Sequence, residues 1–373
     1  MDKEKNRIAF IIGTRAELIK TFPVMLELQK TKTPYCFIHT GQHNLKDLCK
    51  KFGIKTPDIS LSTEHEGSSR FNSKEIKAIM WNVSLLFKIK KELKKMKGLE
   101  YVLYHGDTMT TFTSALASSR LLNPFKKYKN VHLEAGLRSF SLREPFPEEI
   151  SRIVAGIFSD VLLAPSKLSE WHLRNKRCKD IQVVGNTVVD SALHALDMAK
   201  KQKVKILSSG RFALITVHRH ENLKSKKRLT QIVEILNSIP IKSYFAMHTN
   251  TRAKLEKFGL YDKLMQNKNI KILPPMDYPE FIAQIEKCSL IVCDGGSMQE
   301  ESLIFGKPCV ILRNATERQE GLETNFQFLT KLDVIKTKQK IQEYLSKDFK
   351  IREYTNPYGK KGVSKKIVGR LLK

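Results

Sequence analysis

The stretch IVCDGGSMQEESLIFGKP (residues 291–308) decides the fold class of this chain. It starts as a short β-branched run, passes through a glycine-rich turn at 294–297 and continues as a helix-like segment. A strand, a tight turn and a helix in this order form half of a βαβ unit, and the N–H groups at the start of the helix face an anion. The stretch therefore predicts an α/β protein with a phosphate-type turn.

Short apolar runs of the same kind recur along the chain and alternate with amphipathic stretches. Such nearly continuous runs are typical of strands buried on both faces of parallel sheets. The runs lie at 8–13, 36–41, 101–106, 131–136, 161–166, 181–186, 212–218, 244–248, 270–273, 290–295 and 308–313. Helical periodicity appears at 73–97, 187–203, 224–238 and 335–346. Repeated βα units of this length predict doubly wound layers.

A polar break near 176–205 divides these units into two groups. We expect a Rossmann-like domain over residues 1–178 and a second one, which binds the nucleotide, over 179–354. A helix over 355–373 is expected to cross back to the first domain. Ligands of such domains bind at the carboxyl ends of the strands, so the polar residues there favour one central cleft that the two domains face.

Composition excludes several classes of protein. The chain has 373 residues, 41% hydrophobic and 28% charged, which is ordinary for a folded domain pair. It shows no apolar run of membrane-spanning length and no signal peptide, so we expect a cytoplasmic protein without membrane insertion. The net charge of +28 comes from lysines spread along the chain rather than from one basic stripe, which argues against a nucleic-acid partner.

Candidate chemical groups lie where several of these runs end. Arg15 and Lys20 follow the first run, and Arg is suited to bidentate contact with phosphate oxygens. Asp107 follows another run, where an N-cap role is the alternative. The segment 218–221 reads His-Arg-His-Glu, and the block VHLEAGLRSFSLREPFPEEISR (131–152) combines glutamates with arginines. Acids, arginines and a phosphate-type turn together indicate an enzyme that acts on an anionic sugar or nucleotide.

Metal and serine-hydrolase chemistry find little support in the sequence. It contains no HExxH motif, no paired aspartate motif and no cysteine cluster with metal-ligand spacing, so we expect no metal site. The six cysteines suit reduced, buried thiols. A GxSxG elbow is also absent.

In this order, the motifs resemble the UDP-N-acetylglucosamine 2-epimerase family, and most closely its non-hydrolysing branch. The matching stretches are GTRAELIK (13–20), TGQH (40–43), HGDT (105–108), HLEAGLRS (132–139), PFPEEISR (145–152), VGNTVVDS (184–191), TVHRHEN (216–222), DGGSMQEE (294–301), GKPCVILR (306–313), ATER (315–318) and NPYG (356–359). The resemblance implies a GT-B-like fold and inversion of C2 of UDP-N-acetylglucosamine to give UDP-N-acetylmannosamine. It implies elimination and re-addition of UDP without a cofactor.

The resemblance also assigns roles to residues. It makes Asp107, Glu134, Glu148 and His218 the acid and base candidates. Contacts with the substrate or its UDP part are assigned to Arg15, Lys20, Arg138, Gly296, Ser297, Glu301 and Arg313, with Glu301 on the ribose. A second, activating substrate molecule would contact Gln42, Arg70, Glu149, Arg219 and His248. The family also implies a homodimer and a role in precursor synthesis for surface polysaccharides.

The sequence departs from the family pattern at several positions. Ala16 replaces the usual proline, His220 replaces an arginine, and DGGS replaces DSGG, so that a hydroxyl moves from position 295 to Ser297. Leu45 stands where the family has a polar residue of the activator site, which predicts weak activation. Three other functions remain open: a hydrolysing epimerase that releases N-acetylmannosamine and UDP, a GT-B glycosyltransferase, and a nucleotide-sugar or polyanion-binding protein without activity.

Overall fold

The structure, a computed structural model, describes residues 7–62, 74–141, 144, 146–174, 180–274 and 276–373. The chain forms two compact units, each of which contains one parallel sheet. Unit 1 comprises residues 1–138, 145–191 and 358–373, and unit 2 comprises residues 139–144 and 192–357.

Unit 1 is built on a seven-stranded sheet in the order β3-β2-β1-β4-β5-β6-β7. Its strands are β1 (Ile8–Ile12), β2 (Tyr35–His39), β3 (Ile59–Ser60), β4 (Tyr101–His105), β5 (Lys129–Leu133), β6 (Val161–Ala164) and β7 (Asp180–Val183). The helices between them are α1 (Arg15–Lys30), α2 (Lys46–Phe52), α3 (Lys74–Lys95), α4 (Met109–Ala117), α5 (Glu148–Phe158) and α6 (Lys167–Leu173). All neighbouring strands are parallel.

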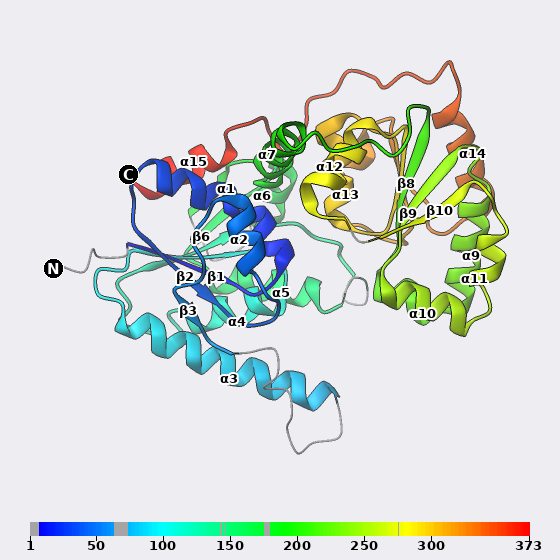
Figure 1. Cartoon of the computed structure of the whole chain (residues 1–373). Helices are drawn as coiled ribbons and strands as arrows, with labels where there is room; N and C mark the ends of the chain where they lie inside the picture. Colours follow the sequence, from blue (N-terminus) through cyan, green and yellow to red (C-terminus); the bar gives the residue numbers. More distant parts are fainter. Residues whose placement is uncertain (1–6, 63–73, 142–143, 145, 175–179, 275) are drawn as a thin grey trace. The chain divides into compact units, whose positions relative to one another are not determined.

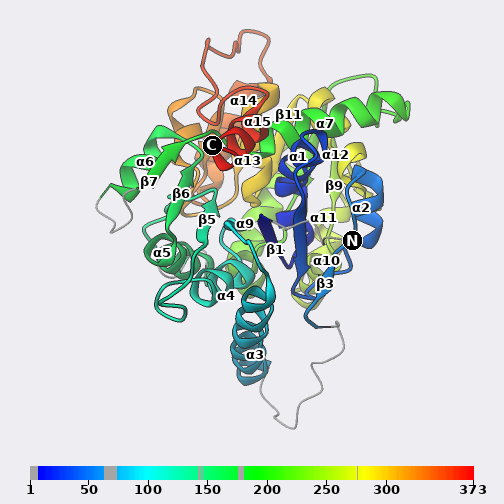
Figure 2. The ribbon, with the colours of Figure 1, turned by 90° about the vertical axis from the view of Figure 1, so that its left-hand side faces the viewer.

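Helices cover both faces of this sheet, as a doubly wound topology requires. Every residue of β1 is buried, which is why the run IAFII is apolar throughout. Helix α1 packs against α15 (Val363–Leu371) on one face, whereas α3, α4 and α5 pack side by side on the other (Figures 1 and 2). The chain leaves β1 in one direction and β4 in the other, so the ends of these two strands flank the topological switch point.

The strand at 181–186 lies in a different unit from the one that we expected. We placed it after a boundary at residue 178, but β7 pairs in parallel with β6 as the edge of the first sheet. Unit 1 then continues to residue 191, within α7 (Val188–Lys201). The polar segment before β7 therefore precedes an edge strand of unit 1, because all four residues of β7 pair with β6. Residues 358–373 also belong to unit 1.

Unit 2 contains a six-stranded sheet in the order β10-β9-β8-β11-β12-β13. The strands are β8 (Phe212–Thr216), β9 (Lys242–Ala246), β10 (Ile270–Leu273), β11 (Leu290–Cys293), β12 (Cys309–Ile311) and β13 (Gln327–Leu329). The helical segments are α8 (His220–Lys224), α9 (Lys226–Asn237), α10 (Thr249–Lys257), α11 (Tyr261–Met265), α12 (Tyr278–Lys287), α13 (Gly296–Phe305), η1 (Gln319–Glu323) and α14 (Val334–Leu345). The switch point lies between β8 and β11.

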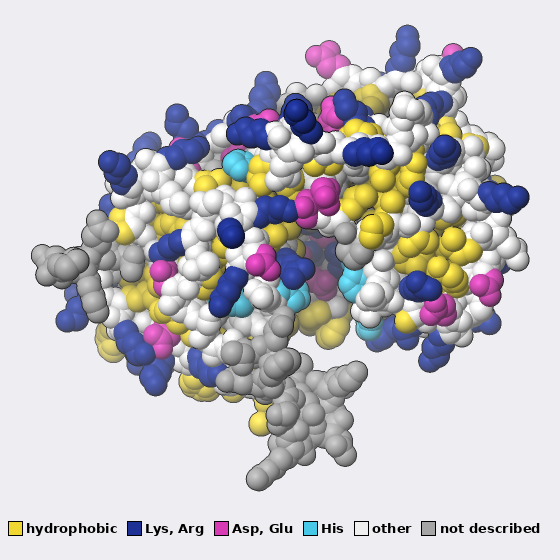
Figure 3. Space-filling view, in the orientation of Figure 1, with side chains coloured by type: hydrophobic (Ala, Val, Ile, Leu, Met, Phe, Trp, Pro, Cys, Tyr) yellow, Lys and Arg dark blue, Asp and Glu magenta, His cyan; other side chains and the backbone are white. Residues whose placement is uncertain are grey.

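The surface and the core agree with the composition. Lysines and arginines are spread over the face seen in Figure 3 rather than gathered in one patch. The five described cysteines are free and buried, while Cys178 lies outside the described residues. Within the described parts of the chain, no helix is long and apolar enough to cross a membrane. The expected fold class, α/β with two Rossmann-like doubly wound domains of the GT-B-like type, is confirmed.

Candidate active site

The candidate groups of unit 1 follow the carboxyl ends of β1, β2, β4 and β5. Arg15 follows β1, Gln42 follows β2, Asp107 follows β4 and Glu134 follows β5. In a parallel sheet these ends share one edge, and the switch point between β1 and β4 is the usual place for a ligand. The topology therefore brings these four sequence-predicted residues to the same edge of unit 1.

Glu134 is the most constrained of these groups. It has a left-handed backbone, with φ at +63°, which is uncommon for a residue other than glycine and often marks a functional site. Its Oε2 accepts from Lys20 Nζ at 2.5 Å and from Asn186 Nδ2 at 2.8 Å. Lys20 and Glu134 form a buried ion pair, which favours the ionised carboxylate of Glu134, while the contact that we expected between Lys20 and the diphosphate stays a prediction.

A second charged network surrounds Asp107. The Arg152 guanidinium donates to Asp107 Oδ2 through one nitrogen and to Glu149 Oε2 through the other, at 3.2 Å. Glu149 Oε1 in turn accepts from Arg138 Nε. Arg138 and Glu149, for which we expected contacts with the substrate and the activator respectively, are thus linked to Asp107 through Arg152. Glu148 begins α5 beside them and is partly exposed.

The turn after β1 holds Arg15 in an exposed position. Arg15 donates its backbone N–H to His43 Nδ1 at 3.3 Å, and its side chain is exposed. The turn is fixed by Glu17, whose Oε2 accepts the backbone N–H groups of Gly13 and Thr14 at 2.8 and 2.7 Å. Glu17 Oε1 accepts from Thr108 in the turn after β4 at 2.5 Å. Sequence reasoning missed Glu17, although its position three residues after Thr14 is the signature of a capping box.

Two buried histidines lie next to this edge. Burial lowers the pKa of His105 to about 4, and burial likewise lowers the pKa of His132 to about 4. The Nε2 atom of His132 lies 2.7 Å from the Gly106 carbonyl oxygen. Since a carbonyl oxygen only accepts, the neutral ring carries its proton on Nε2. Both side chains are neutral at pH 7.

In unit 2, Asp294 organises the turn that carries His218. Its buried carboxylate accepts the backbone N–H groups of His218 and Arg219 at 3.0 and 2.9 Å, as well as Asn222 Nδ2 at 3.0 Å. His218 Nδ1 lies 3.5 Å from Asp294 Oδ1, and its side chain is half exposed. Partial burial lowers the pKa of His218, while Asp294 acts in the opposite direction. The ring is therefore oriented by Asp294 and accessible at the end of β8.

The N-terminus of α13 lies in the turn where we expected an anion to bind. Gly295 is the N-cap, and no side chain caps it, so the first N–H groups of the helix have no side-chain acceptor from that residue. Position 296 requires glycine, because an added Cβ would lie 2.3 Å from Arg318 Nη1. Ser297 is partly exposed in the first turn.

A buried ionic network connects α13 to residues 313–318. Arg318 Nε lies 2.9 Å from Glu300 Oε1, and its Nη1 donates to Glu317. Arg313 Nη1 donates to Glu317 Oε2 at 3.0 Å. Arg313, which we expected to contact the substrate, is almost fully buried in this network. Sequence reasoning did not find the pairing of Glu300, Glu317 and Arg318.

Glu301 is placed differently from its neighbours. Its Oε1 accepts from the Tyr278 hydroxyl at 3.0 Å, and the side chain is buried. Burial and the nearby Glu301 carboxylate raise the pKa of Tyr278 well above its usual value. Tyr278 therefore keeps its proton and acts as a donor that orients Glu301.

The expected activator residues are distributed over both units. In unit 1, Gln42 Oε1 accepts from Thr110 Oγ1 at 3.2 Å. In unit 2, Arg219 Nη2 lies 3.9 Å from Glu317 Oε1, and exposed His248 caps α10. Leu45 is 1% exposed, so its side chain packs in the core. Arg70 lies outside the described residues.

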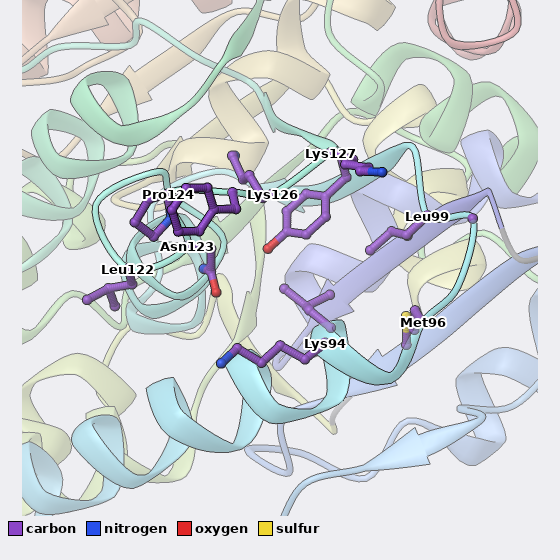
Figure 4. A pocket seen from close by; sticks show the side chains of 12 residues that line it. Lys94, Met96, Leu99, Leu122, Asn123, Pro124, Lys126 and Lys127 are labelled. Atoms are coloured by element: carbon purple, nitrogen blue, oxygen red, sulfur yellow. The ribbon is translucent and has the colours of Figure 1, made fainter.

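A separate pocket in unit 1 lies away from this edge. Figure 4 shows it between the end of α3 and the segment before β5, lined by residues that include Lys94, Leu99 and Leu122. Its volume is about 440 Å³. These segments precede the starts of β4 and β5, at the opposite ends of the strands from Asp107 and Glu134. The pocket therefore does not belong to the candidate active site.

Among the described residues, no group of three or more acidic, histidine or cysteine side chains is arranged to hold a metal ion.

Comparison with known proteins places the chain in one family. Residues 26–372 match the family model described as UDP-N-acetylglucosamine 2-epimerase. A UDP-N-acetylglucosamine 2-epimerase of Methanococcus maripaludis is 36% identical over 97% of both chains. A UDP-2,3-diacetamido-2,3-dideoxy-D-glucuronate 2-epimerase of Pseudomonas aeruginosa is 34% identical over 83% of this chain and 84% of that protein.

Solved structures agree with the sequence relatives. The crystal structure of the Methanocaldococcus jannaschii UDP-GlcNAc 2-epimerase in complex with UDP-GlcNAc and UDP has a TM-score of 0.82 and 32% identity. The similarity covers 98% of this chain and 99% of that one. Together with the family model, this similarity over almost the whole length shows that the chain belongs to the UDP-N-acetylglucosamine 2-epimerase family.

Proposed function

We propose that this chain interconverts UDP-N-acetylglucosamine and UDP-N-acetylmannosamine by inverting C2. The observation that carries the proposal is the buried Lys20–Glu134 pair at the end of β5, on the same sheet edge as Asp107. Family membership supplies the substrate class, and this edge supplies ionised carboxylates held by cations. Such groups perform general acid and base chemistry.

The reaction proceeds by elimination and re-addition. A carboxylate removes the proton from C2, the C2–H electron pair forms the C1=C2 double bond, and the C1–O bond breaks so that UDP leaves with its electron pair. UDP oxygen then adds back to C1, while an acid delivers a proton to the opposite face of C2. The two steps have no net redox change. Asp107, Glu134 and Glu148 in unit 1 and His218 in unit 2 are the acid and base candidates.

The leaving diphosphate needs positive charge and N–H donors. In unit 1 the exposed Arg15 side chain is suited to this role, because its planar guanidinium bonds two phosphate oxygens at once. In unit 2 the N-terminus of α13 offers backbone N–H groups and the Ser297 hydroxyl. Glu301, oriented by Tyr278, is the candidate acceptor for ribose hydroxyls.

The identity of the sugar is tested with two substrates. One relative of 34% identity is named for a 2,3-diacetamido glucuronate, so that substrate is the second candidate. Incubation of the enzyme with each UDP-sugar alone, followed by NMR, distinguishes the outcomes. We expect UDP-N-acetylmannosamine from UDP-N-acetylglucosamine. Turnover of the diacetamido uronate alone would reassign the substrate, and free N-acetylmannosamine with UDP would indicate the hydrolysing reaction.

We also propose that the enzyme is a homodimer that shows weak activation by substrate. The outer face of α3 exposes Met80, Val83 and Phe87 at helical spacing, which is an apolar stripe suited to a second copy. Light scattering should give a dimer mass that Phe87→Lys lowers.

For activation, the initial rate against UDP-N-acetylglucosamine should be nearly hyperbolic, since Leu45 offers no polar group. A sigmoidal rate curve would show a functional activator site.

A further inference from the structure

The carboxylate of Glu134 has a second partner besides Lys20. Asn186 Nδ2 donates to Glu134 Oε2 at 2.8 Å, across 52 positions of sequence. Asn186 is 1% exposed and lies in the segment between β7 and α7, within unit 1. None of the roles discussed above uses this residue.

The orientation of the Asn186 amide is fixed by its other contacts. Its Oδ1 accepts the backbone N–H of Val188 at 3.0 Å, and its own backbone N–H donates to the Tyr358 carbonyl at 2.9 Å. In the flipped orientation of the amide, the oxygen would face Glu134 and the NH2 group would face the Val188 N–H. Neither pair could form a hydrogen bond, so the flipped orientation is excluded. The NH2 group must therefore face the carboxylate, and it can only donate.

Two donors thus converge on the same oxygen of Glu134. Lys20 and Asn186 both donate to Oε2, while Oε1 lies 3.7 Å from the position that a Cβ on Gly106 would occupy. The carboxylate is consequently held with Oε1 turned toward the turn that carries Asp107. A donor that cannot accept stabilises the ionised form of its partner.

We propose that Asn186 is a positioning residue that orients Glu134 and keeps it ionised for proton transfer at C2. The inference rests on the proposed function, since it assigns Asn186 a role through a candidate base of that reaction. In this role Asn186 acts on the reaction only through Glu134.

Other titratable groups that face Glu134 come from three elements. They are Lys20 on α1, His105 on β4, with Nε2 at 4.0 Å from Glu134 Oε2, and His132 on β5. Burial holds the pKa values of both histidines at about 4, so neither changes charge near pH 7. A new pH dependence near neutrality in an Asn186 variant would therefore come from Glu134 and the new group.

The decisive variant is Asn186→Asp, which keeps the acceptor for Val188 but places a second carboxylate beside Glu134. Two carboxylates at hydrogen-bond distance cannot both ionise easily, so the pKa of Glu134 should rise. The acidic limb of the plot of kcat against pH should therefore move up by about one pH unit or more. We expect kcat at pH 7 to fall about tenfold or more. UDP affinity should stay within about threefold, because the charge-assisted contacts to the diphosphate are unchanged.

Asn130→Asp is the matched control. Asn130 is also buried, and it lies on β5 itself, where its Nδ2 donates to Ser118 Oγ and to the Phe158 carbonyl. It should lose thermal stability like Asn186→Asp but keep the acidic limb of the wild type. An unmoved limb in Asn186→Asp, or an equal shift in Asn130→Asp, would overturn the proposal.

Two further measurements cover the other outcomes. If Asn186→Asp does not fold, Asn186→Ser keeps a hydroxyl that can accept the Val188 N–H and loses the NH2 donor to Glu134. It should lower kcat about tenfold and leave KM within about threefold, whereas wild-type kcat would refute the role. If the wild type has no epimerase activity, the proposed function fails, but infrared titration still decides the inference. In difference spectra against Glu134→Gln, the Glu134 carboxylate band should titrate at higher pH in Asn186→Asp than in the wild type.

Discussion

Lys20 and Glu134, separated by 114 positions in sequence, form a buried ion pair with 2.5 Å between Nζ and Oε2. Helix α1 supplies the cation and the end of β5 supplies the carboxylate. A cation in this position keeps the carboxylate ionised inside the protein, which is the state that a general base needs. We therefore expect the pair to contribute both to the stability of unit 1 and to its proposed chemistry.

The first prediction separates these two contributions with a double-mutant cycle. Lys20→Met and Glu134→Gln each remove one partner of a buried pair and leave the other charge buried, so each should cost about 3–5 kcal/mol. The double variant should be less destabilised than the sum of the two single variants, because no charge stays unpaired. All three should lose kcat by about 10²-fold or more. Urea unfolding and initial rates measure both effects, and strictly additive losses would contradict the pairing.

The second prediction concerns the diphosphate. Arg15→Ala should weaken UDP binding by about 1.5–3 kcal/mol, the scale of a charge-assisted hydrogen bond. Arg120→Ala is the control, since Arg120 is exposed and lies 3.7 Å from Asp160, just before the start of β6. Calorimetry with UDP should show a loss for Arg15→Ala only. Unchanged affinity would place the diphosphate contact on other cations.

The third prediction tests the turn of α13. Gly296→Ala should destabilise unit 2 by about 1–3 kcal/mol, because its Cβ would overlap Arg318, which Glu300 and Glu317 hold in place. Gly369→Ala, in α15 with open space around it, should be neutral or stabilising by up to about 1 kcal/mol. Thermal melts distinguish the two variants.

Ser297→Ala, in the same turn, should keep stability and cost about 1 kcal/mol of UDP affinity, which calorimetry with UDP measures.

The fourth prediction concerns acid stability. The folded-state pKa of His132 is about 4, below its unfolded value of 6.5, so the unfolded chain binds the proton first. Stability is therefore full above pH 6.5 and falls as the pH drops toward 4, by on the order of 3 kcal/mol for this residue. His132→Gln, which still has a donor for the Gly106 carbonyl, should reduce the loss of melting temperature between pH 7 and pH 5. Exposed His220→Gln is the control and should not reduce it.

Much of the fold could be predicted from local patterns. Each predicted apolar run became a strand, because parallel strands buried on both faces need continuous apolar sequence. The strands β3 and β13 were missed, since they have only two and three residues and no extended apolar run. The apolar pattern of β7 alone could not show which sheet it joins, because its pairing with β6 depends on tertiary contacts.

The site was predictable as a set of residues but not as a set of contacts. Strand-end positions and family motifs indicated Asp107, Glu134 and His218. No sequence pattern indicates that Lys20 pairs with Glu134, or that Arg313 is buried against Glu317. These partners are distant in sequence or depend on side-chain direction, which only packing determines.

Proton exchange at C2 tests the central claim most directly. The enzyme is incubated with UDP-N-acetylglucosamine in D2O, and the C2 position of the product is observed by NMR and mass spectrometry. Elimination followed by re-addition predicts UDP-N-acetylmannosamine with deuterium at C2, because the proton that Glu134 or another base removes is not the one returned. A product that retains protium fully at C2 would contradict the account.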